Sequence, residues 1–182
     1  VFQTVLSQRW TIETMQSGFN MYKELRVLNP SPYMYYFHFG EFEIIGSSPE
    51  MIVKESGGKV QTCPIAGTRK RGKTKEEDEA LRKELLDDPK EKAEHVMLVD
   101  LARNDMGRIA EFGTVKVTQY MKVQNYSHVM HIVSMVEGRK KKEYHPCDLL
   151  TSFLPAGTLS GAPKIRAMEI IHELEKSTRG IY

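Results

Sequence analysis

The sequence predicts an α+β fold, a sandwich of antiparallel sheets flanked by helices. Short alternating or β-branched runs, with glycine at the reversals, indicate antiparallel strands before residue 64 and again after residue 113. Two helical patterns in series lie between these regions, and strands and helices do not alternate as they do in a βαβ protein. A chain of 182 residues with 40% hydrophobic residues can enclose one core or two small ones.

The N-terminal third of the chain is expected to be mostly sheet. Residues 1–9 alternate between two faces, as a strand does. A helix of about three turns then ends before Asn29 and Pro30, because a residue that precedes proline avoids the helical region. Short strands follow between residues 33 and 63, and the basic residues 69–75 are predicted to form an exposed loop.

Helix-start signals dominate the middle of the chain. Thr74 and Glu77 have the spacing of a capping box. Asp88 followed by Pro89 repeats the signal for a second helix, which is expected to run to about residue 106. This second helix has apolar residues on more than one face, so we expect it to be largely buried.

Strands and a final helix are expected in the C-terminal part of the chain. Residues 115–120, 121–126 and 129–138 have strand patterns. Residues 152–164 are rich in glycine, proline, serine and threonine, and they lead into a helix from residue 163 to about residue 176. Free backbone N–H groups at this helix start could bind a carboxylate or a phosphate, and a purely structural cap is the alternative.

Several titratable side chains are candidates for chemistry. Glu91 and Glu94 are three residues apart on a helix, so their carboxylates could hold a hard divalent ion together, and a solvated pair is the alternative. Glu94 and Asp100 lie among apolar residues, where a buried carboxylate needs a cation, an arginine or a ligand nearby. His131 shares a strand face with valines, so the pattern alone favours a core histidine.

Charge and hydropathy exclude several classes of partner. The 26 lysines and arginines against 24 acidic residues leave a net charge of +2, and the basic stretches 69–75 and 139–142 contain no aromatic residues, so no nucleic-acid partner is expected. No apolar run approaches the ~20 residues that span a bilayer, and no signal peptide is recognisable. We therefore expect a cytoplasmic protein without a membrane partner, in which Cys63 and Cys147 are reduced.

Five motifs, taken together and in order, resemble the chorismate-utilising enzymes, and within them the anthranilate synthase component I branch. They are GSSPEMIVK at residues 46–54, PIAGTRKRG at 64–72, EKAEHVMLVDLARNDMGR at 91–108, SHVMHIVS at 127–134 and PAGTLSGAPKIRAMEII at 155–171. The resemblance implies that residues 1–182 are part of a single chorismate-binding domain, truncated at both ends. The family's N-terminal region and the rest of its C-terminal domain would be absent.

The same resemblance implies roles for individual residues. Glu94 would be a ligand of Mg²⁺, with Glu91 as a close or water-mediated acidic group. Glu50 would be the general acid that assists loss of the C4 hydroxyl of chorismate. His131 would lie near the C4 oxygen or act in the elimination of pyruvate. The implied substrate contacts are Gln3, Gly67, Thr68 and Tyr182.

Two positions distinguish the branches of this family. Gln3 stands where water-adding relatives carry a lysine base, and Ala66 stands where aminodeoxychorismate synthases carry a lysine nucleophile. The resemblance therefore implies that ammonia is the nucleophile, that a glutamine amidotransferase subunit, anthranilate synthase component II, supplies it, and that anthranilate and pyruvate are formed. Aminodeoxychorismate synthase and a non-catalytic amino-acid-binding or interaction module on the same fold are the alternatives.

One further segment resembles the tryptophan feedback site of the family. It comprises Asn29, Pro30, Ser31, Pro32, Tyr33 and Met34. An ordinary turn between a helix and a strand is the alternative, because the two prolines would also fix an extended backbone there. Since the other half of this pocket and the second metal-binding carboxylate lie in segments that the 182 residues lack, we predict that this exact chain has little or no activity.

Overall fold

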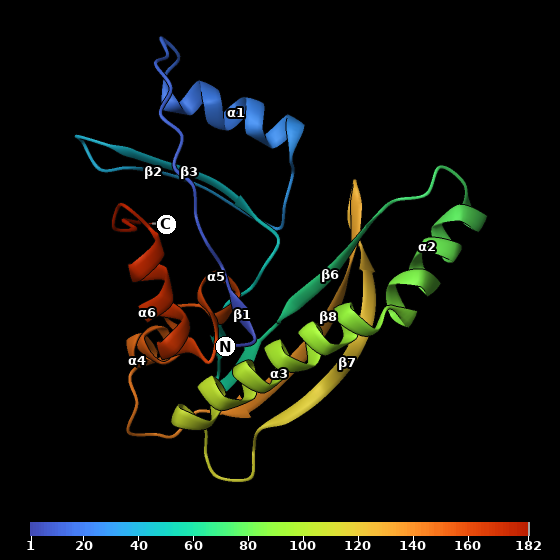
Figure 1. The fold of residues 1–182 in the computed structure, drawn as a ribbon. Helices are drawn as coiled ribbons and strands as arrows, with labels where there is room; N and C mark the ends of the chain where they lie inside the picture. Colours follow the sequence, from blue (N-terminus) through green and yellow to red (C-terminus); the bar gives the residue numbers. More distant parts are fainter. Residues whose placement is uncertain (182) are drawn as a thin grey trace. The chain divides into compact units, whose positions relative to one another are not determined.

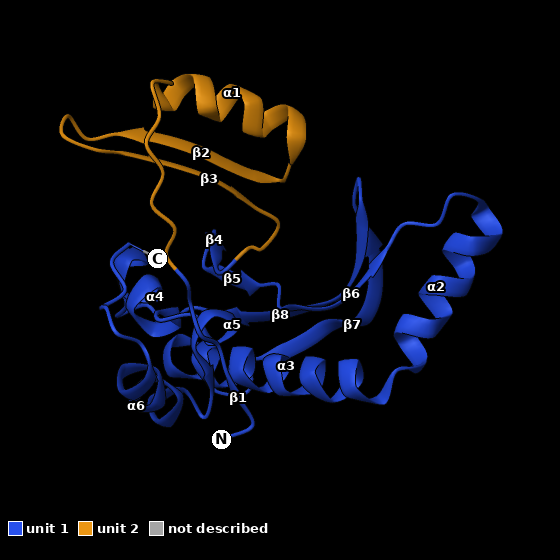
Figure 2. Cartoon of the chain, turned by 45° about the horizontal axis from the view of Figure 1, so that its top comes forward, with its two compact units in different colours: residues 1–8, 52–182 blue, residues 9–51 orange. Residues whose placement is uncertain are grey.

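The computed structural model describes residues 1–181. Contacts within it divide the chain into two compact units (Figure 2). The smaller unit is Arg9–Met51, and the larger one combines Val1–Gln8 with the chain from Ile52 onward. That both units belong to one chorismate-binding domain stays a prediction.

The smaller unit is a helix packed on a two-stranded hairpin. Helix α1 (Gly18–Leu28) starts at Ser17, whose hydroxyl accepts a hydrogen bond from the backbone N–H of Asn20 at 3.3 Å. Strands β2 (Tyr33–His38) and β3 (Glu43–Ser48) pair antiparallel. The Tyr36 ring lies 5.4 Å from that of Phe19, so the alternating pattern of β2 turns one face toward the helix.

The larger unit is built on a five-stranded antiparallel sheet with β8 (Val129–Arg139) at its centre. On one side, the two halves of β8 pair with β5 (Lys59–Thr62) and β6 (Ile65–Lys70), and on the other side β8 pairs with β7 (Lys116–Asn125) along most of its length. Strand β4 (Lys54–Ser56) completes the sheet by pairing with β5.

Two consecutive helices connect β6 to β7. The first, α2 (Lys75–Asp87), is capped by Thr74, and the second, α3 (Pro89–Ile109), is capped by Asp88. Helix α3 lies along the sheet and contacts β6 and β8 (Figure 1). The main core forms where α3 meets β5, β8 and α4 (Pro146–Phe153); its buried members are Val60, Val99, Ala102, Met106, Ile109, Ala110, Val136, Leu149 and Phe153.

The C-terminal elements bring the two ends of the larger unit together. They are α4 (Pro146–Phe153), α5 (Gly157–Ser160), β9 (Gly161–Ala162) and α6 (Lys164–Leu174). Strand β1 (Gln3–Thr4) pairs antiparallel with β9. Beyond this pair, the Glu175 carboxylate accepts hydrogen bonds from Ser7 and Arg179, and these contacts hold the pKa of Glu175 at about 2.

The structure confirms the α+β class and corrects several boundaries. The N-terminal strand is only two residues long, because its partner β9 is equally short. Residues 116–125 form one strand rather than two, and β7 continues through an irregularity at Met121, which has a φ of 49°. Helix α4 was not predicted. Among the described residues, no helix is both long and apolar enough to cross a membrane.

Three expectations about the middle of the chain need correction. Residues 71–74 form the predicted loop, but Arg69 belongs to β6 and its side chain is only 20% exposed. Helix α3 is buried on one face only, and Val96 on the opposite face is 40% exposed. Asp100 also lies outside the core, with a side chain that is 64% exposed and paired with Arg103 at 2.9 Å.

Candidate active site

A bulge in strand β6 positions the predicted histidine. Gly67 has a φ of 72°, a conformation that favours glycine, and the pairing of β6 with β8 shifts register between Ala66 and Thr68. The Gly67 carbonyl oxygen and the Thr68 hydroxyl each lie 3.0 Å from Nδ1 of His131. Because a carbonyl only accepts, its hydrogen bond requires a proton on Nδ1, which leaves Nε2 able to accept one.

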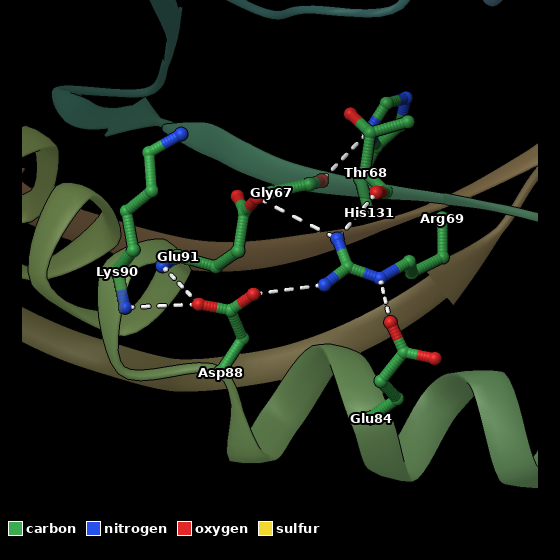
Figure 3. A network of polar contacts seen from close by, with 8 residues as sticks. All are labelled: Gly67, Thr68, Arg69, Glu84, Asp88, Lys90, Glu91 and His131. Carbon is green, nitrogen blue, oxygen red and sulfur yellow. Dashed lines mark hydrogen bonds and ion pairs between the residues drawn. The ribbon is translucent and has the colours of Figure 1, made fainter.

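An arginine next to this bulge gathers three carboxylates. Arg69 donates to Glu84 at 2.7 Å and to Asp88 at 2.9 Å, and it lies 3.5 Å from a carboxylate oxygen of Glu91 (Figure 3). We call these four residues the Arg69 cluster. Hydrogen bonds to Glu84 and Asp88 raise the pKa of Arg69. The backbone N–H of Glu91 and the Arg69 guanidinium lower the pKa of Asp88, the residue that caps α3.

The two candidate metal carboxylates have different partners. Glu91 leans toward β6, since a Cβ atom added to Gly67 would lie 3.1 Å from Glu91 Oε2. Glu94 accepts a hydrogen bond from Gln3 Nε2 at 2.9 Å. The structure therefore connects Glu91 to the bulge that also holds His131, and it connects Glu94 to the N-terminal strand β1.

Gln3 and Glu94 line a cavity of about 950 Å³ between α3 and the β1–β9 pair. The Oε1 atom of Gln3 is buried without a hydrogen-bond partner. The full lining is Phe2, Gln3, Lys90, Ala93, Glu94, Val96, Met97, Asp100, Leu101, Asn104, Ala162 and Pro163. This is a mainly apolar space with a few polar groups, as small-molecule sites usually are.

The oxygen atoms of Glu94 and Gln3 are of the chemical type that binds a hard cation. Carboxylate and amide oxygens are the ligands that Mg²⁺ takes from proteins, and Gln3 Oε1 is an oxygen with an unused lone pair. Within residues 1–181, however, no group of three or more His, Cys, Asp or Glu side chains is arranged to hold a metal. Mg²⁺ usually keeps several waters or substrate oxygens, so Glu94 and Glu91 would supply only part of its coordination shell.

The other predicted residues belong to the smaller unit or fall outside the description. Glu50 is half-buried after β3, and its backbone N–H donates to the Ser48 hydroxyl at 3.2 Å. The segment from Asn29 to Met34 connects α1 to β2, where the Asn29 carbonyl accepts a hydrogen bond from the Ser47 hydroxyl at 2.7 Å. Tyr182 lies outside the described residues.

Comparison with known proteins decides the family. The sequence model of chorismate binding enzymes matches residues 1–182. The chain belongs to the chorismate binding enzyme family. The resemblance seen in the five motifs is thereby confirmed.

Among the relatives of this chorismate binding enzyme chain, an anthranilate synthase component 1 from Acetivibrio thermocellus is 65% identical over all 182 residues. The crystal structure of anthranilate synthase component I from Streptococcus pneumoniae superposes with a TM-score of 0.85 at 52% identity, over 93% of this chain. A Bacillus anthracis protein described as an isochorismate synthase has a TM-score of 0.74 at 26% identity, over 87% of this chain and 43% of its own. The chain spans 37% of the length of each of the first two relatives.

Sequence reasoning missed two buried polar pairs beside α3 in this chorismate binding enzyme chain. Asp105 pairs with Lys164 at 2.9 Å, and their side chains are only 6% and 12% exposed. The apolar character of α3 did indicate a buried carboxylate that needs a cation, but it did not distinguish Asp105 from Asp100. His95, fully buried, lies 2.6 Å from the Ser134 hydroxyl, and burial lowers its pKa to about 4.

Proposed function

We propose that the protein carrying this chain is component I of anthranilate synthase, which converts chorismate and ammonia to anthranilate and pyruvate. The observation that carries the proposal is 65% identity over the whole chain to a protein of that name. Gln3 supports it, because its neutral amide, bonded to Glu94, occupies a place where water-adding relatives are expected to carry a lysine base. Ala66 likewise offers no amine.

The proposed reaction has two steps, and this chain supplies groups for both. Glu50 gives a proton to the C4 hydroxyl, which leaves as water while ammonia forms a bond to C2. The enolpyruvyl group then leaves as pyruvate, and the ring becomes aromatic by loss of the C2 proton. His131 is suited to hold a proton near the C4 oxygen or the departing group, since its Nδ1 is engaged by Gly67 and its Nε2 is free to accept.

The acidic residues of α3 are proposed to hold Mg²⁺ for the ring carboxylate of chorismate. Glu94 is proposed as a direct ligand of the ion, and Glu91 as a nearby acidic group that is close to the ion or contacts it through water. When bound, the ion would supply positive charge that offsets the substrate carboxylate. Gly67 and Thr68 are proposed substrate contacts beside this place, and Tyr182 is proposed as a further one.

Two partners belong to the same proposal. Ammonia is mostly protonated at neutral pH and does not attack in that form, so a glutamine amidotransferase subunit, component II, is proposed to deliver it. Tryptophan is proposed to inhibit through the segment from Asn29 to Met34. Two prolines hold that segment extended between α1 and β2.

Product chromatography tests the proposed function. The whole protein, with its natural ends, is given chorismate, Mg²⁺ and an ammonium salt at a pH that supplies free ammonia. We expect anthranilate and pyruvate in equal amounts. Aminodeoxychorismate without pyruvate would assign the protein to the folate branch, and no product would favour a binding module.

Two variants and one shortened chain sharpen this test. Glu94→Gln keeps the hydrogen bond from Gln3 but removes a charge, and it should lower kcat/KM about 100-fold, the scale of losing a metal-site contact. Glu79→Gln, on the exposed side of α2 with a side chain 72% exposed, should leave kcat/KM unchanged. The 182-residue chain by itself should show little or no turnover.

A further inference from the structure

Arg69 is the one residue that connects the bulge of β6 to the start of α3 through charged contacts in the described part of the chain. Its Nε donates to Glu84 on α2, and one terminal nitrogen donates to Asp88, the cap of α3. The other terminal nitrogen donates to the Thr68 carbonyl at 2.9 Å and lies 3.5 Å from Glu91. Each guanidinium nitrogen therefore has its own partner (Figure 3).

Because each nitrogen of Arg69 has a different partner, the planar shape of the guanidinium matters for these contacts as much as its charge. A guanidinium is a planar fork whose donors point in fixed directions, whereas a lysine ammonium is a single point charge. Once Glu84 and Asp88 hold the plane of Arg69, the remaining nitrogen can lie in only one place beside Glu91. That place is next to Gly67, whose missing side chain leaves room for the Glu91 carboxylate.

We propose that Arg69 is a positioning residue for the reaction, which fixes the Glu91 carboxylate relative to His131. The inference rests on the proposed function and names a residue to which that function assigns no role. Arg69 and the Gly67–Thr68 carbonyls belong to the same strand, and His131 bonds to Gly67. Because Arg69 and the residue that binds His131 lie on the same strand, the contact between Arg69 and Glu91 fixes the distance between this carboxylate and the histidine.

Arg71 provides a matched control on the same stretch of chain. Its guanidinium makes equally short contacts, donating from Nε at 2.9 Å and from a terminal nitrogen at 2.8 Å to Asp78 on α2. Its other terminal nitrogen donates to the Tyr126 carbonyl at 2.9 Å. Arg71 therefore also ties the end of β6 to α2, but it contacts none of the proposed site residues directly and reaches His131 only through Tyr126, whose ring lies 5.3 Å from the histidine ring.

The test compares Arg69→Lys with Arg71→Lys in the whole protein, with ammonia as the nitrogen source. Both variants keep their charge, and both should lower the melting temperature by similar amounts. At saturating Mg²⁺, Arg69→Lys should lower kcat about 10- to 100-fold with little change in the KM for chorismate, the usual cost of losing a positioning contact. Arg71→Lys should keep kcat within about twofold, the small effect expected away from the site.

A binding measurement gives a second readout that does not depend on turnover. Calorimetric titration with Mg²⁺ alone should show a dissociation constant about tenfold weaker in Arg69→Lys and unchanged in Arg71→Lys. Glu84→Ala, which removes an exposed anchor of Arg69 and should fold normally, should reproduce part of both effects.

Three results would overturn the inference. Full kcat in Arg69→Lys would mean that only charge matters, and an equal loss in Arg71→Lys would mean that the arginines serve stability alone. If Arg69→Lys does not fold, wild-type kcat and Mg²⁺ affinity in Glu84→Ala would refute the positioning role. Absence of anthranilate from the wild-type protein would instead reject the proposed function.

Discussion

Lowering the pH from 7 to 5 should cost the protein about 2 kcal/mol of folding free energy through His95 alone. Burial lowers the pKa of this histidine from 6.5 to about 4, because the imidazolium would lose its hydration in the core. The unfolded chain therefore binds the proton more tightly than the folded chain. The stability from the neutral ring is complete above pH 6.5 and is lost as the pH falls toward 4.

Urea unfolding at several pH values measures this effect, with His95→Gln as the comparison. Glutamine places its Nε2 near the position of the histidine Nε2, so it can keep the contact with Ser134 while losing the titration. Wild type should lose stability between pH 6.5 and 5, and the variant should lose much less. Acidic groups such as Glu175, with a pKa of about 2, change the free energy of unfolding only at lower pH. Equal pH dependence of the two proteins in this window would refute the reasoning.

Two further predictions concern packing beside the cavity. Asp105→Asn should destabilise the protein by about 3–5 kcal/mol in urea unfolding, because it leaves the Lys164 ammonium buried without its counter-ion; the reasoning fails if the double variant with Lys164→Met is no more stable than the single one. Gly161→Ala should lower the melting temperature far more than Gly113→Ala. Both glycines have positive φ, but only at Gly161 would a Cβ lie 2.1 Å from the Gln3 carbonyl oxygen. Similar shifts in melting temperature would contradict this.

Local signals predicted the helices and the larger strands because they depend on neighbouring residues. Thr74 and Asp88 cap α2 and α3 as their spacing indicated, and the helix before Pro30 ends at Leu28. The length of β1 was not predictable in this way. It depends on β9, a partner of two residues whose own extent is limited by the start of α6.

The sequence predicted which residues belong to the candidate site, but it did not predict the ion pairs that join them. Motif resemblance identified Gly67, Glu91 and His131, and the structure brings these three together around β6. It did not indicate that Arg69 would join them, because a basic stretch is usually a solvated loop. Ion pairing with carboxylates from two helices is a tertiary effect that pattern reasoning along one stretch cannot detect.

The contacts between Ser7 and Glu175 join positions 168 residues apart. At a synthesis rate of about 5–20 residues per second, the N-terminal strand waits about 10 to 30 s on the ribosome before its partners are made. Until then Gln3 has no β9 to pair with, and the wall of the cavity that it forms is missing. The nascent chain can complete its central sheet first, and the cavity wall that contains Gln3 can form only after residue 162 has been made.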